Sequence, residues 1–457
     1  MEPRSLKYVC AACGAEQRSG APDALVSRIC TDSRQAQAGD LFFALAGERF
    51  DGHRFLPEVT QKKVAAVVVE RAKASFADRG CAVLAVENSR QALGQLAANY
   101  RAEFDLPMIA VCGSNGKTTT KDLLAAVLSG RFKTLSSPAS FNNNIGVPLT
   151  LLNLEQKHRV AILEAGTNHP GELAPLLRMI LPGLGVLTSL GREHLEFFGD
   201  LGGVVQEEGW LAELLPTHGK LVINTDSEWT SHVPRRARAE VVRVGFGADN
   251  DWQAASVSQN ETGLTFRVNA PLPKFTGAYQ VGLLGRHQAV NALLAIAVGA
   301  ELGLNPEEVR RGLERCAPPK MRLQIWEAHG VRVLDDCYNA NADSMLAALQ
   351  TLHDLPTRGR RIAVLGDMAE LGEQSALAHA EMGRRAAELG VAGLVAVGKW
   401  ACQTGEAARA AGLENVSEFA DLSAAAEAVK MLVKPGDLVL LKASRTVGLE
   451  RIGEALK

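Results

Sequence analysis

One segment constrains the fold of this chain more than any other, the sequence VCGSNGKTTT at residues 111–120. It follows a short apolar run at 108–112 and leads into 117–128, where the spacing of apolar residues is typical of a helix. A strand that turns through glycines into a helix is typical of sheets in which parallel strands alternate with helices. The segment therefore predicts an α/β domain with a mostly parallel sheet.

The same segment has the composition of a phosphate-binding loop. Gly113 and Gly116 let the backbone approach phosphate oxygens closely, and amide groups at the start of a helix point toward an anion. The Lys117 ammonium can reach the terminal phosphates, and the Thr118 hydroxyl can ligate Mg²⁺. The strict P-loop pattern requires a glycine where this chain has Val111, so the alternative is a glycine turn with an incidental lysine. We predict that the nucleotide is bound by Gly113, Ser114, Asn115, Gly116, Lys117, Thr118 and Thr119.

Two further residues follow apolar strands and could serve the same site. Glu164 comes directly after the apolar run 160–163, and a carboxylate at that edge of a neighbouring strand is well placed to hold Mg²⁺ at the γ-phosphate. His194 follows the run 185–190 in the sequence GREHL. Taken alone, Glu164 could equally be a solvated turn acid, and a single histidine is more often structural than a metal ligand.

The pattern along the chain predicts an α/β protein with three domains, at 1–86, 87–318 and 319–457, and about three is also what the length suggests. The segment 241–284 has alternating character and is expected to add antiparallel strands to the central sheet. After Pro318-Pro319 a second βα alternation predicts a Rossmann-like domain. Strands are expected at 41–45, 65–69, 82–86, 108–112, 160–163, 185–190, 220–224, 264–268, 331–334, 361–365, 394–397 and 438–441. Helices are expected at 91–103, 117–128, 289–302, 344–352, 375–389 and 423–432.

Composition excludes several classes of protein. The net charge is -2, whereas a dedicated nucleic-acid binder usually carries a net basic charge or a basic stripe. The longest apolar stretch, 293–304, is too short to span a bilayer, and no signal peptide is seen, so we expect a cytoplasmic protein with no membrane partner. The eight cysteines are scattered and form no disulfide framework. Cys10 and Cys13 lack two further ligands for zinc and are expected on a helix.

Short motifs along almost the whole chain, in this order, resemble those of the Mur ligases, the ATP-dependent amide-forming enzymes of peptidoglycan synthesis. They are TDSR at 31–34, GDLF at 39–42, DGH at 51–53, the loop at 113–118, NN at 142–143, Glu164, His194, GRH at 285–287 with Asn291, Arg322, DCYNAN at 336–341, GDMAELG at 366–372 and KASR at 442–445. The shorter loop of this family also accounts for Val111. The chain departs from the family at Ser140, where asparagine is usual, at Met321 and Ala443, where glycine is usual, and at Ala342, where proline is common.

The resemblance implies a role for each matched residue. The first domain would recognise the uridine nucleotide, and Mg²⁺ would be held by Thr118, Glu164, His194 and Glu208. Beyond the phosphate loop, the implied ATP-site residues are Asn291, Arg322, Asp336 and Tyr338. The implied substrate-binding residues are Asp32, Ser33, Arg34, Asn142, Asn143, Asn168, His169, Asn339, Asn341, Asp367 and Glu370. The implied catalytic residues are Lys117, Glu164, His194, Glu208 and Arg322.

Glu208 departs from the family pattern at a position that bears on metal binding. In the family a carbamylated lysine supplies a carboxylate to the second metal, and Glu208 takes the place of that lysine here. A glutamate offers a carboxylate without carbon dioxide, so we hypothesise that Glu208 replaces the carbamate directly. The alternative is a surface acid in the pair Glu207-Glu208.

The resemblance also implies a reaction. The segment 366–372, followed by Ser375 and His379, points to the member that adds D-alanyl-D-alanine to UDP-N-acetylmuramoyl-tripeptide through an acyl phosphate. The expected cofactors are ATP and Mg²⁺, the expected partners are these two substrates, and a monomer is expected. The alternatives are another Mur-type amino-acid ligase, a ligase like folylpolyglutamate synthetase, and a P-loop module that hydrolyses ATP without ligation. The motif DSR at 32–34 argues against the folate enzyme, and a switch module would not need phosphate-directed residues in a third domain.

Overall fold

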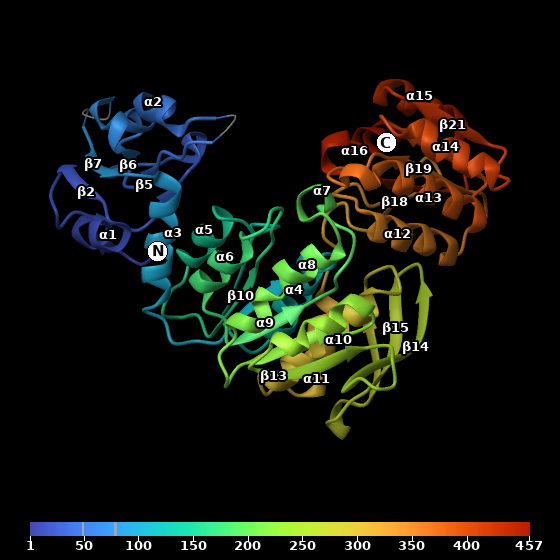
Figure 1. Ribbon diagram of the computed structural model, residues 1–457, viewed down its shortest axis with the longest axis horizontal. Helices are drawn as coiled ribbons and strands as arrows, with labels where there is room; N and C mark the ends of the chain where they lie inside the picture. The colour runs from blue at the N-terminus through green and yellow to red at the C-terminus, as the bar shows by residue number, and fades with distance from the viewer. Residues whose placement is uncertain (48–49, 77–79) are drawn as a thin grey trace. The chain divides into compact units, whose positions relative to one another are not determined.

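The computed structural model describes residues 1–47, 50–76 and 80–457 (Figure 1). The chain forms two compact units. The first consists of Met1–Ala110, Phe132–Thr167 and Glu172–Leu184, and the second of Val111–Arg131, Asn168–Gly171 and Gly185–Lys457. The architecture is a three-domain α/β fold with a large, mostly parallel sheet, as expected. The boundaries predicted after residues 86 and 318 stay predictions.

The N-terminal part is a small α/β layer around a five-stranded sheet of order β2-β7-β6-β5-β4, in which only β2 is antiparallel to its neighbour. Its core consists of Phe42 and of small or β-branched side chains from the strands and the adjoining loops, together with Leu56 and Val59 of a short helix. Its strands are β1 (Arg4–Ser5), β2 (Glu16–Ser19), β3 (Leu25–Val26), β4 (Ile29–Cys30), β5 (Leu41–Phe43), β6 (Ala66–Glu70) and β7 (Ala82–Val86). Its helices are α1 (Leu6–Cys13), η1 (Ser33–Gln35), η2 (Gly52–Phe55), α2 (Leu56–Gln61), η3 (Arg71–Phe76) and α3 (Ser89–Arg101).

The central sheet has nine strands in the order β16-β15-β14-β13-β12-β11-β8-β10-β9. Helix α10 packs against α4 and several of these strands, and it is apolar on nearly all sides because almost its whole surface is buried. The strands are β8 (Met108–Cys112), β9 (Thr134–Ser136), β10 (Val160–Glu164), β11 (Leu184–Leu187), β12 (Lys220–Asn224), β13 (Glu240–Gly245), β14 (Trp252–Asn260), β15 (Gly263–Asn269) and β16 (Gly277–Val281). The helices are α4 (Lys117–Leu128), α5 (Gly146–Leu151), α6 (Leu173–Ile180), α7 (Leu195–Phe198), α8 (Leu201–Glu208), α9 (Trp210–Leu214), η4 (Glu228–His232), η5 (Pro234–Arg236), η6 (Pro273–Phe275), α10 (Gln288–Glu301) and α11 (Pro306–Arg315).

The C-terminal part is a six-stranded sheet of order β17-β18-β22-β19-β20-β21, parallel except for β17. Helices α15 and α16 share a core with its strands, and α13 packs against both α12 and α14. Its strands are β17 (Gln324–Ala328), β18 (Val331–Asp335), β19 (Arg361–Gly366), β20 (Gly393–Val397), β21 (Val416–Phe419) and β22 (Leu438–Lys442). Its helices are α12 (Ala342–Asp354), η7 (Gly372–Gln374), α13 (Ser375–Glu388), α14 (Ala401–Ala410), α15 (Leu422–Leu432), η8 (Arg445–Val447) and α16 (Glu450–Leu456).

The antiparallel strands expected in the central sheet are present, and one strand of that segment departs from the expected direction. The segment 241–284 was expected to add antiparallel strands, and β14, β15 and β16 do pair antiparallel. Strand β13, however, is parallel to both β12 and β14. The chain between β12 and β13 contains two 3-10 helices and returns to the end of the sheet at which β12 begins. A crossover connection of this kind joins two parallel strands. Alternation of apolar residues shows that a strand is half-buried but says nothing of its direction.

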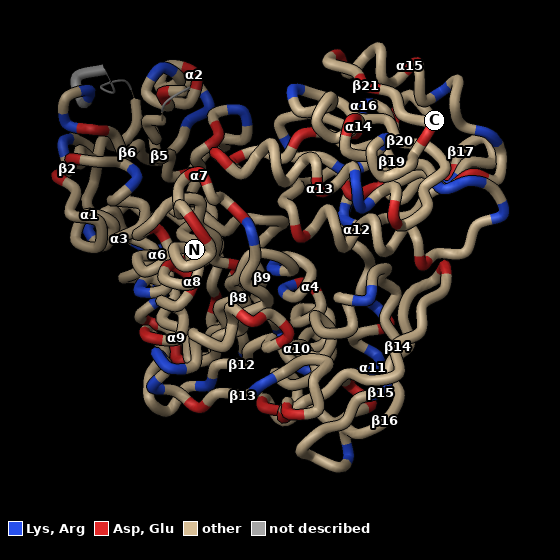
Figure 2. The backbone as a smooth tube through the Cα atoms, turned by 45° about the vertical axis from the view of Figure 1, so that its right-hand side comes forward, with Lys and Arg blue, Asp and Glu red and all other residues tan. Residues whose placement is uncertain are grey.

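The distribution of charged residues and the state of the cysteines agree with what the composition predicts. Basic and acidic residues are interspersed along the chain, as Figure 2 shows. Within the described ranges, all eight cysteines are free, and Cys10 and Cys13 lie on helix α1 as expected. No helix among these residues is long and apolar enough to cross a membrane.

Candidate active site

The phosphate loop lies between buried strand β8 and helix α4, as predicted. Gly113 has a φ of 116° and Gly116 a φ of 88°, conformations that residues with a side chain rarely adopt. A Cβ atom at Gly113 would lie 2.6 Å from the Thr188 hydroxyl, and one at Gly116 would lie 2.8 Å from Oδ1 of Asn291. Both glycines are therefore required by backbone conformation and by space, and Asn291 lies against the loop where an ATP-site residue was expected.

Lys117, the first residue of α4, folds back over the loop. Its ammonium donates to the carbonyl oxygens of Gly113 and Ser114, the second at 3.1 Å. A carboxylate oxygen of Glu193 lies 3.6 Å from the same ammonium. Sequence reasoning did not select Glu193, although it directly precedes His194. The lysine charge is thus held at the place where the phosphates of a nucleotide are expected.

The other loop residues tie the loop to neighbouring segments. The Ser114 hydroxyl accepts from the Gly191 N–H at 2.9 Å, and the Asn115 N–H donates to the Ser189 hydroxyl at 3.2 Å. Asn341 donates from Nδ2 to Oδ1 of Asn115 at 3.0 Å. Ser114 and Asn115 therefore help to shape the loop, and Asn341 brings the C-terminal part to it.

Glu208, at the end of α8, lies beneath the loop. It is only 1 % exposed, and its Oε2 accepts from the Gly113 N–H at 2.8 Å. Its Oε1 is buried and has no hydrogen-bond partner among the described residues. Burial raises the pKa of this carboxyl to about 8, against the opposing attraction of Lys117 and with added repulsion from Glu193. The interpretation of Glu208 as a surface acid is wrong, and its unpaired buried oxygen suits a cation.

Glu164 ends strand β10 in the first unit and is also 1 % exposed. Its Oε1 accepts from Nδ2 of Asn142 at 2.9 Å, while its Oε2 is buried without a partner in the described parts of the chain. The Asn143 side chain lies just before α5, where its Oδ1 accepts from the N–H groups of Ile145 and Gly146. Asn142 thus positions Glu164, whereas the Asn143 side chain is engaged locally.

His194 is held by the C-terminal part. Its φ is 50°, in the left-handed region, and its Nδ1 bonds to a carboxylate oxygen of Glu370. That hydrogen bond lowers the pKa of the Glu370 carboxyl. Engagement of Nδ1 leaves Nε2 as the nitrogen that can bind a metal, as in histidine ligands oriented by a carboxylate. The predicted residues Asn168 and His169 are exposed, and the His169 ring lies 4.1 Å from that of Phe197.

Arg322 reaches the phosphate loop from the C-terminal part. Its Nη2 donates to the Thr118 hydroxyl at 3.2 Å, and its guanidinium carbon lies 4.2 Å from the centre of the Tyr338 ring. A guanidinium stacked on an aromatic face is held in place and keeps its charge. The predicted ATP-site residues Arg322, Tyr338 and Thr118 therefore form one contact.

Asp336 forms hydrogen bonds with Leu323 and Lys442 that the sequence did not indicate. Its Oδ1 accepts from the Leu323 N–H at 3.1 Å, and its Oδ2 accepts from the ammonium of Lys442 at 2.5 Å. Lys442 is only 2 % exposed and also donates to the carbonyl oxygen of Asn339 at 3.1 Å. The buried pair fixes the segment that carries Arg322 and Tyr338, and the exposed Asn339 side chain is left at the surface.

A three-residue ion cluster, Arg192, Asp343 and Glu381, joins the central and C-terminal parts of the second unit. Arg192 donates to Asp343 from its backbone N–H at 2.6 Å and from Nε at 3.0 Å, and its Nη1 donates to Glu381 at 2.7 Å. Sequence reasoning missed this cluster because its members are far apart in the chain and belong to no motif.

In the N-terminal part, Asp32 caps η1 and forms a two-point contact with Arg34, at 2.9 Å from Nε and 2.8 Å from Nη2. This hydrogen bonding lowers the pKa of Asp32 to about 2. The Arg34 side chain is 86 % exposed, while Ser33 is buried. The motif is thus a capped turn whose arginine is exposed to solvent and paired with Asp32.

The donor atoms fit Mg²⁺ in part. Mg²⁺ prefers oxygen ligands and is usually held by one or two carboxylates together with substrate phosphates. In the second unit, the Thr118 hydroxyl and the buried unpaired oxygen of Glu208 are donors of this kind. Among the described residues, no group of three or more histidine, cysteine or acidic side chains forms a complete metal cage. The residues therefore suit an ion that arrives with the nucleotide.

Three family models match most of the chain. The Mur ligase catalytic domain matches residues 25–101, the Mur ligase middle domain matches 111–299, and the Mur ligase glutamate ligase domain matches 321–445. The chain belongs to the Mur ligase family. A relative from Bacillus subtilis, called UDP-N-acetylmuramoyl-tripeptide--D-alanyl-D-alanine ligase, is 34% identical over 430 residues, which cover 94% of this chain and 92% of the relative.

Solved structures of Mur ligases agree with the fold. A crystal structure of MurF from Acinetobacter baumannii has a TM-score of 0.91 and 31% identity, and covers 100% of this chain and 99% of that one. A crystal structure of the MurF ligase from Thermotoga maritima in complex with ADP has a TM-score of 0.81 and 28% identity, and covers 94% of this chain and 97% of that one. An adenine nucleotide is therefore bound by a Mur ligase of the same fold.

Proposed function

We propose that this chain is an ATP-dependent ligase that adds D-alanyl-D-alanine to UDP-N-acetylmuramoyl-tripeptide. The observation that carries the proposal is its relation, over 94% of the chain, to a ligase of that name. The phosphate loop, with Lys117 over it and Arg322 reaching it from the C-terminal part, supports ATP as the phosphoryl donor.

A carboxylate is a poor acylating agent, so the reaction must activate it. In the first step of the proposed reaction, the tripeptide carboxylate attacks the γ-phosphorus of ATP, ADP leaves, and an acyl phosphate forms. The amine of the dipeptide then attacks the acyl carbon, the new amide bond forms, and inorganic phosphate leaves. Phosphoryl transfer depends mostly on positioning and on stabilising charge.

The residues of this chain would divide that work. Lys117 would neutralise charge on the β- and γ-phosphates, and Arg322 would add a second positive charge beside Thr118. The Thr118 hydroxyl, Glu208 and Nε2 of His194, all in the second unit, would hold Mg²⁺. Bound Mg²⁺ supplies further neutralisation of phosphate charge. The C-terminal part already carries Arg322 to the loop, and in that position it would help to exclude water from the bound nucleotide.

We further propose a cytoplasmic monomer. The free cysteines support a reducing compartment. Size-exclusion chromatography with light scattering should give the mass of a single chain, and a dimer mass would contradict the proposal.

The decisive experiment is a product assay with UDP-N-acetylmuramoyl-tripeptide, ATP, Mg²⁺ and D-alanyl-D-alanine. D-Glutamate and diaminopimelate, offered as acceptors beside it with the matching shorter precursors, test the other Mur-type reactions. We expect a pentapeptide product and phosphate release only with D-alanyl-D-alanine. Phosphate release that does not depend on any acceptor would favour a hydrolysing switch and overturn the proposal.

A further inference from the structure

Glu193 is a buried carboxylate in the candidate active centre that none of the roles above uses. It is only 6 % exposed and lies in the segment between strand β11 and helix α7. This segment is held in place, because the Ser114 hydroxyl accepts from the Gly191 N–H at 2.9 Å and the Glu193 N–H donates to the Gly191 carbonyl oxygen at 2.9 Å. Burial of a carboxylate costs free energy unless a nearby positive charge compensates for the lost water. A cation is therefore expected beside this side chain.

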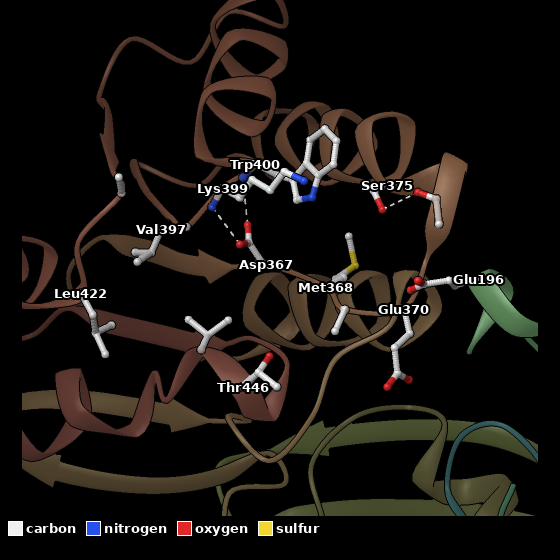
Figure 3. A pocket seen from close by; sticks show the side chains of 15 residues that line it. Glu196, Asp367, Met368, Glu370, Ser375, Val397, Lys399, Trp400, Leu422 and Thr446 are labelled. Atoms are coloured by element: carbon white, nitrogen blue, oxygen red, sulfur yellow. Dashed lines mark hydrogen bonds between the residues drawn. The ribbon is translucent and has the colours of Figure 1, made fainter. Parts of the chain in front are cut away.

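The residues on either side of Glu193 contact the C-terminal part. Arg192 forms an ion pair with Asp343 at 2.9 Å. His194 bonds through Nδ1 to Glu370, which Figure 3 shows at the wall of a cavity in that part. The Glu193 carboxylate lies instead beside the lysine of the phosphate loop. The two flanking contacts fix the backbone of the segment and thereby the direction of the Glu193 side chain.

Two nitrogen atoms lie near one carboxylate oxygen of Glu193. Its Oε2 is 3.6 Å from the ammonium nitrogen of Lys117 and 4.0 Å from Nε2 of His194. The first distance is longer than that of a normal hydrogen bond, so Lys117 neutralises the carboxylate without a tight contact. Nε2 is the histidine nitrogen that can bind a metal, because Nδ1 is engaged by Glu370. The Glu193 oxygen and this nitrogen therefore lie side by side at the place where a metal is expected.

The separation of these two atoms suits a single divalent cation. With ligand distances of about 2.1 Å, two ligands of an octahedral ion lie about 3 Å apart in neighbouring positions and about 4 Å apart in opposite positions. The 4.0 Å between Oε2 of Glu193 and Nε2 of His194 lies within this range. Mg²⁺ prefers oxygen to nitrogen ligands, so a carboxylate beside the histidine makes the position more suitable for this ion.

A second carboxylate, that of Glu208, lies in the same surroundings and in the same compact unit. Glu193 is close enough for its charge to contribute to the raised pKa of Glu208. One oxygen of Glu208 is held by the Gly113 N–H, and the other is buried with no hydrogen-bond partner among the described residues. Lys117 carries one positive charge against these two carboxylates. A divalent cation would balance both and would relieve their mutual repulsion.

We propose that Glu193 is a further ligand of the divalent cation, beside Nε2 of His194. The inference rests on the proposed function, because the cation belongs to the nucleotide of that reaction. In the structure Lys117 is the counter-ion of Glu193. With the cation bound, Glu193 no longer needs the lysine as its counter-ion, and the lysine charge is left for the phosphates. Glu193 is thus a catalytic residue that sequence reasoning did not select, although it directly precedes His194.

The test measures Mn²⁺ binding to the full-length enzyme at saturating ADP, by the electron paramagnetic resonance signal of free Mn²⁺. In Glu193→Gln, which keeps the size of the side chain, the Kd of Mn²⁺ should rise about tenfold or more, because an amide oxygen is a weaker ligand than a carboxylate. Glu193→Asp keeps the charge but draws the oxygens back by one methylene group, so it should also weaken Mn²⁺ binding. Glu196→Gln removes the same charge at an exposed position nearby in the chain and should bind Mn²⁺ as the wild type does.

Calorimetric titration with ADP in EDTA separates a metal ligand from a counter-ion of Lys117. Without metal, the Kd of ADP for Glu193→Gln should not rise, because the variant removes a negative charge near the expected phosphates, and this binding also shows that the variant is folded. Mn²⁺ affinity equal to that of the wild type in both Glu193 variants would show that Glu193 only neutralises Lys117, and would overturn the assignment. A wild-type enzyme that binds Mn²⁺ and ADP but ligates no D-alanyl-D-alanine would instead refute the proposed function.

Discussion

Replacing Glu208 with glutamine should make the free protein more stable at alkaline pH while it removes most of the ligase activity. The wild-type carboxyl is 1 % exposed, and burial raises its pKa from 4.5 to about 8. The folded protein therefore binds more protons at this group than the unfolded chain does between those two values. Stability must fall as the pH rises through this window. A glutamine can still accept the Gly113 N–H and carries no charge.

The magnitude follows from the two pKa values. Linkage predicts that ionisation of Glu208 removes about 2 to 3 kcal/mol of stability between pH 6 and pH 8.5. The unpaired amide group that glutamine leaves buried costs about 1 to 3 kcal/mol, but this penalty does not vary with pH. The difference in stability between variant and wild type should therefore move in favour of the variant by about 2 to 3 kcal/mol over that range.

Thermal unfolding in EDTA, without nucleotide, at pH 6 and pH 8.5 measures this difference. The shift should be visible as several degrees in the melting temperature of the variant relative to the wild type. Glu314→Gln makes the same charge change at an exposed position and should show no such dependence. Parallel pH profiles for Glu208→Gln and the wild type would refute the reasoning. Full ligase activity of Glu208→Gln at saturating Mg²⁺ would refute its place in the metal site.

Three further outcomes are expected. Gly116→Ala should weaken ATP binding more than about tenfold in a calorimetric titration, because its Cβ would lie 2.8 Å from Oδ1 of Asn291 at a φ of 88°; unchanged affinity would contradict the steric argument. Arg322→Met should lower kcat by about tenfold or more in a phosphate-release assay while the melting temperature stays close to that of the wild type, because it loses the Thr118 hydrogen bond and a charge at the phosphates; equal kcat would contradict this role. Burial at the start of α10 lowers the pKa of His287 to about 4, so stability should fall as the pH drops from about 6.5 toward 4, by at most about 2 kcal/mol at pH 5. His287→Gln should remove that loss in thermal unfolding at pH 5 and pH 7.5, and an unchanged acid profile would exclude His287 as its source.

Local sequence was sufficient for the phosphate loop and the strands that lead into it. The predicted strand and helix around it, β8 and α4, have the bounds that were expected. A loop of this kind is defined by its backbone conformation. Residues 113 and 116 adopt positive φ angles, which favour glycine, so the glycines indicate the conformation from the sequence alone. Strand direction is different: β13 pairs parallel on both sides, and its apolar pattern carries no information about pairing.

The sequence by itself determined the kind of protein, because a phosphate loop and a set of ordered motifs are local patterns that can be read from residue types and spacing. The sequence also indicated Glu208 as the carboxylate that replaces the carbamylated lysine of the family. Only the tertiary structure placed that carboxylate beneath the Gly113 N–H and left one of its oxygens buried and unpaired. It alone joined Arg322 to Thr118 and His194 to Glu370. These contacts bring together residues that are far apart in the chain, and burial, charge and reach depend on that folding rather than on neighbours in sequence.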